Sequence, residues 1–271
     1  MSYLALITGA SSGIGEATAR RLAREPDVRL ILVARRAEKL EALCAELGGP
    51  ERALSLALDL TEQDAPARVK ELVLAQGGQL HLLVNNAGAA WRGRFGDTGW
   101  ANLDRHMKLN FEAPARLTEA LLPLLRSTAA GGDSRPGRRV AIVNVASTSG
   151  RVSRPGSGAY SASKFALAGW SDALHLEERE HGVHVGLVLP GFVQTEGFPA
   201  SELLANAVTR RVVSQPDGVA EAIVEAGPGG RAERYVPRYY WIPAALRILA
   251  PGLIRRATAG GAFTTSTKVH D

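Results

Sequence analysis

TGASSGIG, Thr8 to Gly15, stands between a short apolar run and a helical pattern, and this stretch decides the fold. Gly9 permits a tight turn, Gly13 lets the backbone approach a pyrophosphate, and Gly15 allows a helix to pack closely on the strand before it. Amide groups at the start of that helix then face the phosphates. A glycine triplet alone is a weak signal, because glycines also close ordinary turns between a strand and a helix. Here the strand, the triplet and the helix agree, which predicts a dinucleotide-binding loop.

Apolar runs and helical patterns alternate along the rest of the chain. The runs are short and lack polar alternation, which is typical of strands buried on both faces of a parallel sheet. They are LALIT, LILVA, ALSLAL, LHLLV, VAIVNV and VHVGLVL, with RYV near residue 235 as a seventh candidate. Helices are expected at 13–24, 37–47, 62–76, 100–126, 158–181 and 216–226. Right-handed crossovers put helices on both faces, so the sequence predicts an α/β, single-domain Rossmann fold with a doubly wound parallel sheet of six to seven strands.

Length and composition fit one ordinary globular domain. The 271 residues are 45% hydrophobic and 22% charged, close to the average. The single cysteine, Cys44, cannot form an internal disulfide, and no leader-like segment precedes Tyr3, so a reducing cytoplasm is expected. We expect neither a transmembrane helix nor a nucleic-acid partner. The expected organisation is a dinucleotide-binding catalytic domain at 1–237 and a basic, apolar tail at 238–271 that forms no separate domain.

The segment YSASK carries the candidate chemistry. Tyr160 and Lys164 are four residues apart, so on a helix they share a face. A free tyrosine ionises near pH ~10, so lowering its pKa to about 7 takes ~4 kcal/mol; one lysine supplies part of this and a second cation supplies more. A phenol tuned in this way is a general acid or base for an alcohol oxygen at neutral pH. Ser147, thirteen residues earlier, would hold that oxygen by a hydrogen bond.

The end of the second apolar run bears on the choice between NAD and NADP. An acidic residue there would accept hydrogen bonds from the ribose 2′-hydroxyl and repel a 2′-phosphate, but this chain has Ala34, Arg35 and Arg36. A small residue followed by a guanidinium leaves room for a phosphate and donates to it, which favours NADP(H) over NAD(H). The alternative is two solvated arginines that begin a helix. Asp59, after the third run, is placed either to contact the adenine ring or to cap a helix over TEQD.

These residues together resemble the short-chain dehydrogenase/reductase family, in its common form with TGxxxGIG and YxxxK motifs, over positions 3 to 226. The resemblance implies hydride transfer between a nicotinamide and a carbonyl or secondary alcohol, and a homodimer or homotetramer that assembles through the helices at 100–126 and 158–181. It also implies that Asn110 bends a helix and holds a water, and that Lys164 grips the nicotinamide ribose. The implied catalytic residues are Asn110, Ser147, Tyr160 and Lys164. The implied cofactor-binding residues are Gly9, Ser11, Ser12, Gly13, Ile14, Gly15, Arg35, Asp59, Leu60, Asn86, Ala87, Gly88, Tyr160, Lys164, Pro190, Gly191, Val193 and Thr195.

Two departures and two alternatives accompany this interpretation. Ala146 stands where the family often has a second serine, and no basic residue precedes Gly13, which removes one NADP-selective charge. A catalytically silent, nucleotide-sensing protein of the same fold would typically lose the tyrosine or the lysine, and this chain has both. A sugar-nucleotide epimerase or dehydratase would show another glycine spacing and a larger C-terminal part.

The substrate is indicated only weakly. Four aromatic residues are placed to line the mouth of a pocket, which suggests an apolar ketone or alcohol, although local packing explains them nearly as well. They are Trp91, Phe95, Phe192 and Phe198. The tail from Arg238 to Arg256 combines aromatic, aliphatic and arginine residues without an acid, as an interfacial segment does. It suggests a lipid-like substrate and a peripheral membrane location; the alternatives are a cap over the pocket or an oligomer contact.

Three histidines near the end of the YSASK helix could suggest a metal. His175, His181 and His184 are spaced by six and three residues, which matches no zinc pattern, so no metal site is expected.

Overall fold

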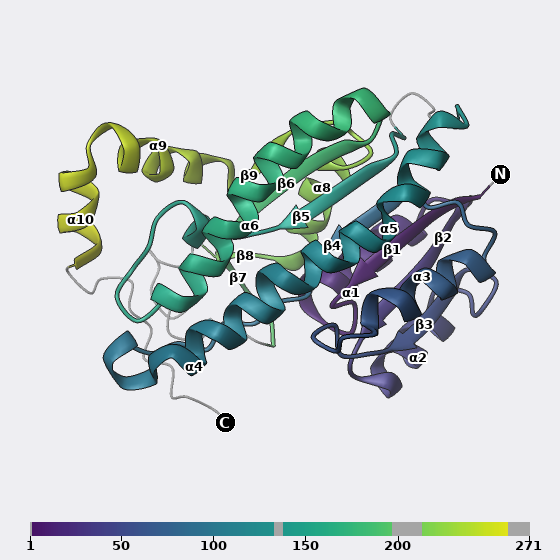
Figure 1. Ribbon diagram of the computed structural model, residues 1–271, viewed down its shortest axis with the longest axis horizontal. Helices are drawn as coiled ribbons and strands as arrows, with labels where there is room; N and C mark the ends of the chain where they lie inside the picture. The colour runs from purple at the N-terminus through teal and green to yellow at the C-terminus, as the bar shows by residue number, and fades with distance from the viewer. Residues whose placement is uncertain (1, 133–137, 197–212, 260–271) are drawn as a thin grey trace.

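The computed structural model describes residues 2–132, 138–196 and 213–259 (Figure 1). In this part of the chain one sheet has seven strands, all parallel, in the order β3-β2-β1-β4-β5-β6-β9. Their bounds are β1 Tyr3–Thr8, β2 Val28–Ala34, β3 Ala53–Ala57, β4 Leu82–Asn85, β5 Ala141–Val145, β6 His184–Pro190 and β9 Glu233–Val236. The strand order reverses between β1 and β4, which is where such sheets bind ligands. The predicted doubly wound sheet is confirmed, including the seventh strand near residue 235.

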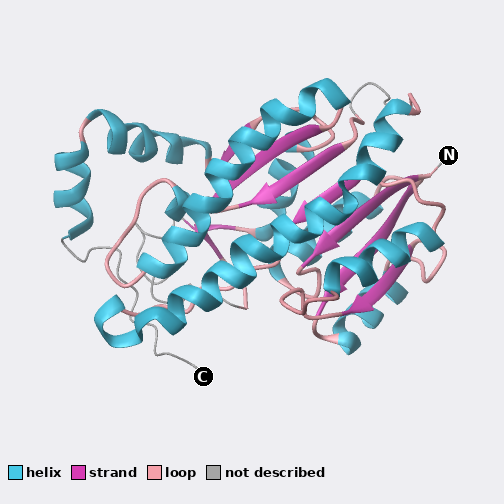
Figure 2. Cartoon of the chain, viewed as in Figure 1, coloured by secondary structure: helices cyan, strands magenta, loops and turns pink. Residues whose placement is uncertain are grey.

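Helices cover both faces of the sheet (Figure 2). One face carries α1 (Gly13–Ala23), α2 (Ala37–Glu46) and α8 (Pro216–Ala226). The other carries α3 (Ala65–Ala75), α5 (Ala113–Ala130) and α6 (Gly158–Glu177). Side chains alternate across each strand, so Leu30 and Leu32 of β2 join the first core cluster and Ile31 and Val33 join the second. Both faces of β2 are therefore buried, as the lack of polar alternation predicts.

The third apolar run, which forms β3, is not buried on both faces as the sequence pattern predicts. β3 lies at the edge of the sheet, and its residues alternate between more and less buried positions, from the buried Ala53 to the exposed Ser55 and Ala57. An edge strand has a neighbour on one side only, so part of it stays in contact with water.

The helix expected at 100–126 is interrupted. The chain forms α4 (Phe95–Met107), a π-helical turn η1 (Lys108–Glu112) and then α5, which continues to Ala130, past the end expected from the sequence. A π turn is a single widened turn and is often found at functional sites. Here it contains Asn110, the residue at which the family resemblance implies a bend.

The C-terminal part adds smaller elements around the ends of the strands. β7 (Phe192–Val193) pairs with β8 (Val213–Ser214) in a separate parallel ribbon. After β9 come the short η5 (Arg238–Tyr240) and then α9 (Trp241–Leu249) and α10 (Pro251–Ala259), which extend away from the sheet (Figure 1). Within the described ranges, no helix has the length and apolarity that a membrane crossing needs.

Candidate active site

The predicted site residues follow the carboxyl ends of the parallel strands. Gly9 follows β1, Arg35 follows β2, Asn86 follows β4, Ser147 comes two residues after β5, and Gly191 follows β6. Because parallel strands end at the same edge of the sheet, the fold brings these residues to one edge although they span most of the sequence.

The glycine loop has the backbone that its sequence requires. Gly9 and Gly13 have φ angles of 67° and 58°, in the left-handed region that favours glycine. A Cβ at Gly15 would lie 2.3 Å from the Gly9 carbonyl oxygen, so α1 packs directly on the loop. Thr195 lies over this loop from the segment after β7, since a Cβ at Gly13 would come within 2.9 Å of Thr195 Cγ2. Ile14 packs on the core cluster beneath α1.

Hydrogen bonds from Thr8 join the end of β1 to the segment after β4. Its Oγ1 donates to the Val84 carbonyl oxygen at 3.1 Å and accepts from the amides of Asn86 and Ala87 at 2.9 and 3.0 Å. The Asn86 side chain donates a hydrogen bond from Nδ2 to the Thr8 carbonyl oxygen at 2.9 Å. These bonds fix the Asn86–Gly88 segment beside the glycine loop, where the sequence predicts a cofactor contact.

Asn110 is fully buried and is held by three hydrogen bonds. Its Oδ1 accepts from the Ala89 amide at 3.0 Å, and its Nδ2 donates to the Ala89 carbonyl oxygen and to Ser163 Oγ, both at 3.0 Å. Gly88 leaves it room, because a Cβ there would lie 2.9 Å from Asn110 Oδ1. The π turn thus ties the segment after β4 to α6.

Lys164 is buried in the same region, with 4% of its surface exposed. Its Nζ donates a 2.9 Å hydrogen bond to the Val145 carbonyl oxygen and lies 6.0 Å from the centre of the Tyr160 ring. Burial disfavours the charged ammonium and lowers the pKa of Lys164 to about 8.

The pKa of Tyr160 differs from the expectation drawn from the sequence, which is a phenol pKa lowered toward about 7. Burial raises the pKa of its phenol above the ordinary value, and a hydrogen bond with Ser147 and the charges of Arg92 and Arg154 oppose that rise only in part. The cations that oppose this rise in the pKa include two arginines that the sequence-based argument did not consider. The protein's own groups keep this phenol protonated at neutral pH.

The two arginines come from loops that the sequence leaves unconnected. The Gly93 amide donates to the Gly156 carbonyl oxygen at 2.9 Å, which joins the loop of Arg92 to the loop of Arg154. The guanidinium of Arg154 lies 4.7 Å from the centre of the Phe192 ring. Sequence reasoning missed both arginines, because neither belongs to a motif and only the fold brings them to Tyr160.

The aromatic residues expected at the pocket mouth lie in different surroundings. Phe192 lies against Arg154, whereas Trp91 packs edge-on to His106 and lies 4.5 Å from the Arg105 guanidinium carbon. Phe95 is 66% exposed at the start of α4. Phe198 lies outside the described residues.

Asp59 caps a turn in this structure. Its Oδ1 accepts from the Thr61 amide at 2.9 Å and from Thr61 Oγ1 at 2.7 Å, and α3 begins only at Ala65. Burial opposes its ionisation, but the Thr61 hydrogen bonds and the Arg35 charge hold the pKa of Asp59 below its ordinary value. Arg35 NH1 lies 4.0 Å from the second carboxylate oxygen. Leu60, beside it, is buried.

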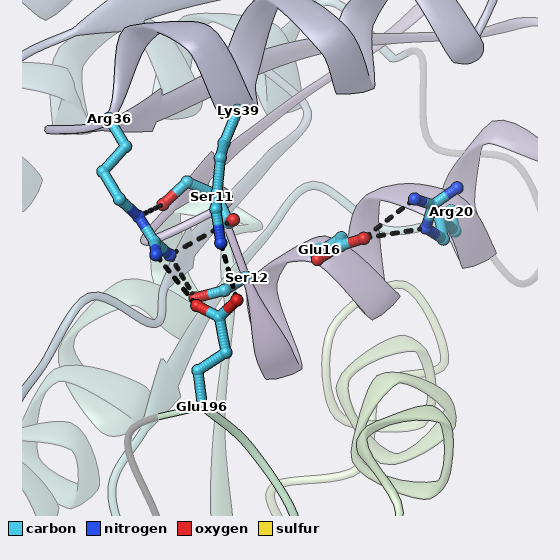
Figure 3. Close-up of polar contacts among 7 residues, drawn as sticks. All are labelled: Ser11, Ser12, Glu16, Arg20, Arg36, Lys39 and Glu196. Atoms are coloured by element: carbon cyan, nitrogen blue, oxygen red, sulfur yellow. Dashed lines mark hydrogen bonds and ion pairs between the residues drawn. The ribbon is translucent and has the colours of Figure 1, made fainter.

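Arg36 makes the more extensive contacts of the two arginines after β2 (Figure 3). It donates from Nε to Ser11 Oγ at 3.2 Å, from NH2 to Ser12 Oγ at 2.6 Å and from NH1 to Glu196 at 2.8 Å. Lys39 reaches the other carboxylate oxygen of Glu196 at 2.6 Å. Sequence reasoning placed Ser11 and Ser12 in the cofactor site but missed Lys39 and Glu196.

The segment after β6 contacts the beginning of the tail. β6 ends at Pro190, and Val193 is buried in β7. A Cβ at Gly191 would lie 2.4 Å from Tyr240 Cε2, so the tyrosine ring rests directly on this glycine. The start of the tail therefore covers one side of the segment expected to flank the nicotinamide.

Two of the three histidines near the end of the YSASK helix bind backbone atoms, and the third, His181, lies 3.6 Å from a Glu180 carboxylate oxygen. His175 Nδ1 lies 2.8 Å from the Val185 carbonyl oxygen, and His184 Nε2 lies 2.9 Å from the Ala226 carbonyl oxygen. Among the described residues, no group of three or more His, Cys, Asp or Glu side chains is arranged to hold a metal.

Known proteins resemble this chain along most of its length. The family model for short chain dehydrogenases matches residues 3–202. Dehydrogenase/reductase SDR family member 7B of Bos taurus is 32% identical over 287 residues, which cover 98% of this chain and 83% of the bovine protein. Oxidoreductase UcpA of Salmonella typhimurium is 34% identical over 226 residues, which cover 82% of this chain and 77% of that protein.

Solved structures agree with these relatives. A short-chain dehydrogenase from Streptomyces avermitilis matches with a TM-score of 0.76 and 30% identity, covering 98% of this chain and 100% of its own. A metagenomic short-chain oxidoreductase, solved in complex with NADP, matches with a TM-score of 0.70 and 31% identity. The match covers 87% of this chain and 97% of that chain. With this strand order, this glycine loop and these relatives, the chain belongs to the short-chain dehydrogenase/reductase family.

Proposed function

We propose that this protein is an NADP(H)-dependent oxidoreductase that transfers a hydride between a nicotinamide and a carbonyl or secondary alcohol. The observation that carries the proposal is the set of Asn110, Ser147, Tyr160 and Lys164 at the carboxyl edge of the sheet, beside the glycine loop. When bound, the nicotinamide would supply the redox chemistry. The protein would orient the cofactor and the substrate and supply the electrostatic environment.

The protein's own residues would bind the substrate and the cofactor and transfer the proton. Ser147 would hold the substrate oxygen, since its hydroxyl already bonds to Tyr160. Tyr160 would give its proton to that oxygen during reduction or accept one during oxidation. Because burial raises the pKa of Tyr160, its phenol is ready to act as the acid, and Arg92 and Arg154 would stabilise the phenolate that remains. Lys164, one turn further along the same face of α6, would hold the nicotinamide ribose.

The preference for NADP(H) rests on the cations around the glycine loop. Arg35, Arg36 and Lys39 stand at the end of β2 and the start of α2, and Arg36 bonds to Ser11 and Ser12. Guanidinium, ammonium and hydroxyl donors suit a phosphate monoester. Similar solved structures contain either cofactor, NADP in the metagenomic oxidoreductase and NAD in a short chain dehydrogenase/reductase from Burkholderia phymatum, so the preference rests on these cations alone.

The experiment is to follow oxidation of NADPH, and separately of NADH, with ketones graded by size and polarity. We expect turnover with NADPH, and a lower kcat/KM with NADH. The alternative, a catalytically silent nucleotide sensor, would bind NADPH and turn over none of the ketones. Binding without turnover of every ketone and of the corresponding alcohols with NADP⁺ would overturn the proposal.

For the tail we propose peripheral contact with an anionic membrane surface, from which a lipid-like substrate would reach the site. Ile248 and Leu249 on α9 are 79% and 80% exposed, and Trp241 and Leu253 are also exposed. The same helices carry Arg247, Arg255 and Arg256, and the chain has no acid between Glu233 and Asp271. Exposed apolar side chains beside arginines fit the boundary between acyl chains and acidic headgroups.

Vesicle flotation tests the membrane proposal with the full-length protein. The wild type should float with vesicles of phosphatidylcholine and phosphatidylserine, and the I248E/L249E variant should not. Leu176→Glu is the matched control, because Leu176 is an exposed leucine on α6, outside the tail, and this variant should float like the wild type. Equal flotation of the wild type and I248E/L249E would contradict the membrane proposal.

We propose a catalytic domain at 1–237 with the tail at 238–271 as an appendage, and a cytoplasmic homodimer or homotetramer. Exposed apolar residues on the helices implied in assembly support an oligomer, notably Trp100 on α4 and Phe165 on α6. Light scattering after size exclusion would test it, since a monomer at micromolar concentration would exclude a stable assembly.

A further inference from the structure

Glu196 holds its carboxylate between two cations at the glycine loop (Figure 3). Oε2 accepts from Arg36 NH1 at 2.8 Å, and Oε1 accepts from Lys39 Nζ at 2.6 Å. The hydrogen bonds from Lys39 and Arg36 lower the pKa of this carboxyl to about 2, so the group is an anion throughout the physiological range. An internal anion therefore pairs with both Arg36, which follows β2, and Lys39, in the first turn of α2.

This place coincides with the position where the fold recognises the 2′ substituent of the adenosine ribose. Arg36 follows the last residues of β2, and Lys39 lies one turn further on in α2. Arg36 also bonds to Ser11 and Ser12 of the glycine loop. In folds of this kind the residues after the second strand discriminate a 2′-hydroxyl from a 2′-phosphate. The group bound there now is a carboxylate from the segment after β7.

We propose that Glu196 competes with the 2′-phosphate of NADP(H) for Arg36 and Lys39, and so sets the strength of NADP(H) binding relative to NAD(H). The proposal rests on the proposed preference for NADP(H). A phosphate and a carboxylate cannot both pair closely with the same two cations without repelling each other. NADP(H) must therefore displace Glu196, whereas NAD(H), which lacks the phosphate, can leave the contact in place.

The displacement is feasible because the Glu196 side chain is 57% exposed. A partly exposed carboxylate that leaves its partners regains water, so the contact is a weak competitor and not a barrier. Thr195, the preceding residue, rests on Gly13 in the same loop. The contact thus places the Thr195–Glu196 turn directly beside the residues expected to bind the cofactor.

The test compares wild type, Glu196→Gln and Glu221→Gln by fluorescence titration with NADPH and NADH. Glutamine keeps the size of the side chain and removes the charge. We expect E196Q to bind NADPH about threefold to tenfold more tightly, with NADH affinity changed less than about twofold. Glu221→Gln is the matched control, because Glu221 is an exposed glutamate paired with Arg21 at 2.6 Å on another part of the surface. It should change neither affinity.

Two further measurements separate this inference from the cofactor proposal. Adenosine 2′,5′-bisphosphate and 5′-AMP, which differ only in the 2′-phosphate, should reproduce the NADPH and NADH results in calorimetry. Arg36→Ala should weaken binding of the bisphosphate but not of 5′-AMP. If R36A behaves so and E196Q leaves NADPH affinity unchanged, Glu196 is no competitor and the inference fails alone. If E196Q weakens both cofactors, Glu196 is a clamp that helps to hold them, which also overturns it. If R36A changes neither probe and the wild type shows no preference, the NADP(H) preference fails as well.

Discussion

Lys164 and Tyr160 lie close together on α6 without touching, since Lys164 Nζ is 6.0 Å from the centre of the Tyr160 ring and donates its hydrogen bond to the Val145 carbonyl oxygen. The lysine is thus anchored to the end of β5. Burial raises the pKa of the phenol, and Ser147, Arg92 and Arg154 oppose that rise. This separation of roles leads to different expectations for the two residues.

Replacing Tyr160 with phenylalanine should remove the proton donor and leave the cofactor site intact. We expect kcat to fall by about 10²-fold to 10⁴-fold, the usual contribution of a general acid. The dissociation constant for NADPH should stay within about twofold of the wild type, because the ring and its packing remain. Steady-state kinetics with the best ketone and a fluorescence titration measure the two quantities. Near-normal turnover would remove Tyr160 from the role of acid.

Replacing Lys164 with methionine should stabilise the fold while it abolishes turnover. Burial lowers the pKa of Lys164 from 10.5 to about 8, so the folded state disfavours the charged form. This penalty is fully present below pH 8, where the lysine is charged in both states, and it fades as the pH rises toward 10.5. After the lost hydrogen bond to Val145 is allowed for, the gain in unfolding free energy should be about 2 kcal/mol at pH 7.

Thermal or urea unfolding without cofactor, at pH 7 and at pH 9.5, measures this effect. The gain from Lys164→Met should shrink at the higher pH. Lys108→Met is the control, because Lys108 is exposed on the π turn and its ammonium lies 2.7 Å from the carboxylate of Asp104. Lys108→Met should not raise the unfolding free energy at either pH. A destabilised K164M at pH 7 would show that the Val145 bond outweighs the buried charge.

The strand ends and most of the candidate site were predictable, because they depend on local patterns. A glycine loop between a strand and a helix, apolar runs without alternation and the YSASK spacing can each be read within about twenty residues of sequence. The π turn at Asn110 was not visible as a separate element, since a widened turn hardly disturbs the apolar spacing of a helix. The edge position of β3 depends on strand order, which its own sequence does not encode.

The electrostatic parts of the site could not be predicted in this way. The pKa of Tyr160 follows from burial and from arginines on two loops, and these meet the tyrosine only after the sheet has formed. The pair of Lys39 and Glu196 joins residues 157 positions apart. Such contacts have no periodicity and no fixed spacing, so only the coordinates reveal them.

Neutralising Arg92 and Arg154 should shift the pH profile of alcohol oxidation. Both cations favour the phenolate, so the R92Q/R154Q variant should raise the pKa of Tyr160 further. Oxidation needs the phenolate as base, and its rising limb in kcat/KM should move upward by about half a pH unit to one unit. Arg105→Gln is the control, since that arginine lies over Trp91. An unmoved limb with a changed KM would assign the arginines to substrate binding alone.

The contact between Gly191 and Tyr240 predicts that the tail supports the segment after β6. An alanine at 191 would place its Cβ 2.4 Å from Tyr240 Cε2, and the ring of a partly buried tyrosine cannot move aside freely. Gly191→Ala should therefore lower the unfolding free energy by about 1–3 kcal/mol, as overpacking commonly does. It should also raise the dissociation constant for NADPH, because Gly191 lies in the segment proposed to flank the nicotinamide.

Gly169→Ala is the matched control, because Gly169 lies inside α6 and a Cβ there meets no atom within 4 Å. That substitution should stabilise the protein by about 0.5–1 kcal/mol, since alanine favours a helix more than glycine does. The double variant G191A/Y240A completes the comparison. If the clash with the ring is the cause, the double variant should lose less stability than the two single losses added together, because residues in contact are not additive. Additive losses would mean that Gly191 is needed for its backbone alone, and that the tail does not brace this side of the site.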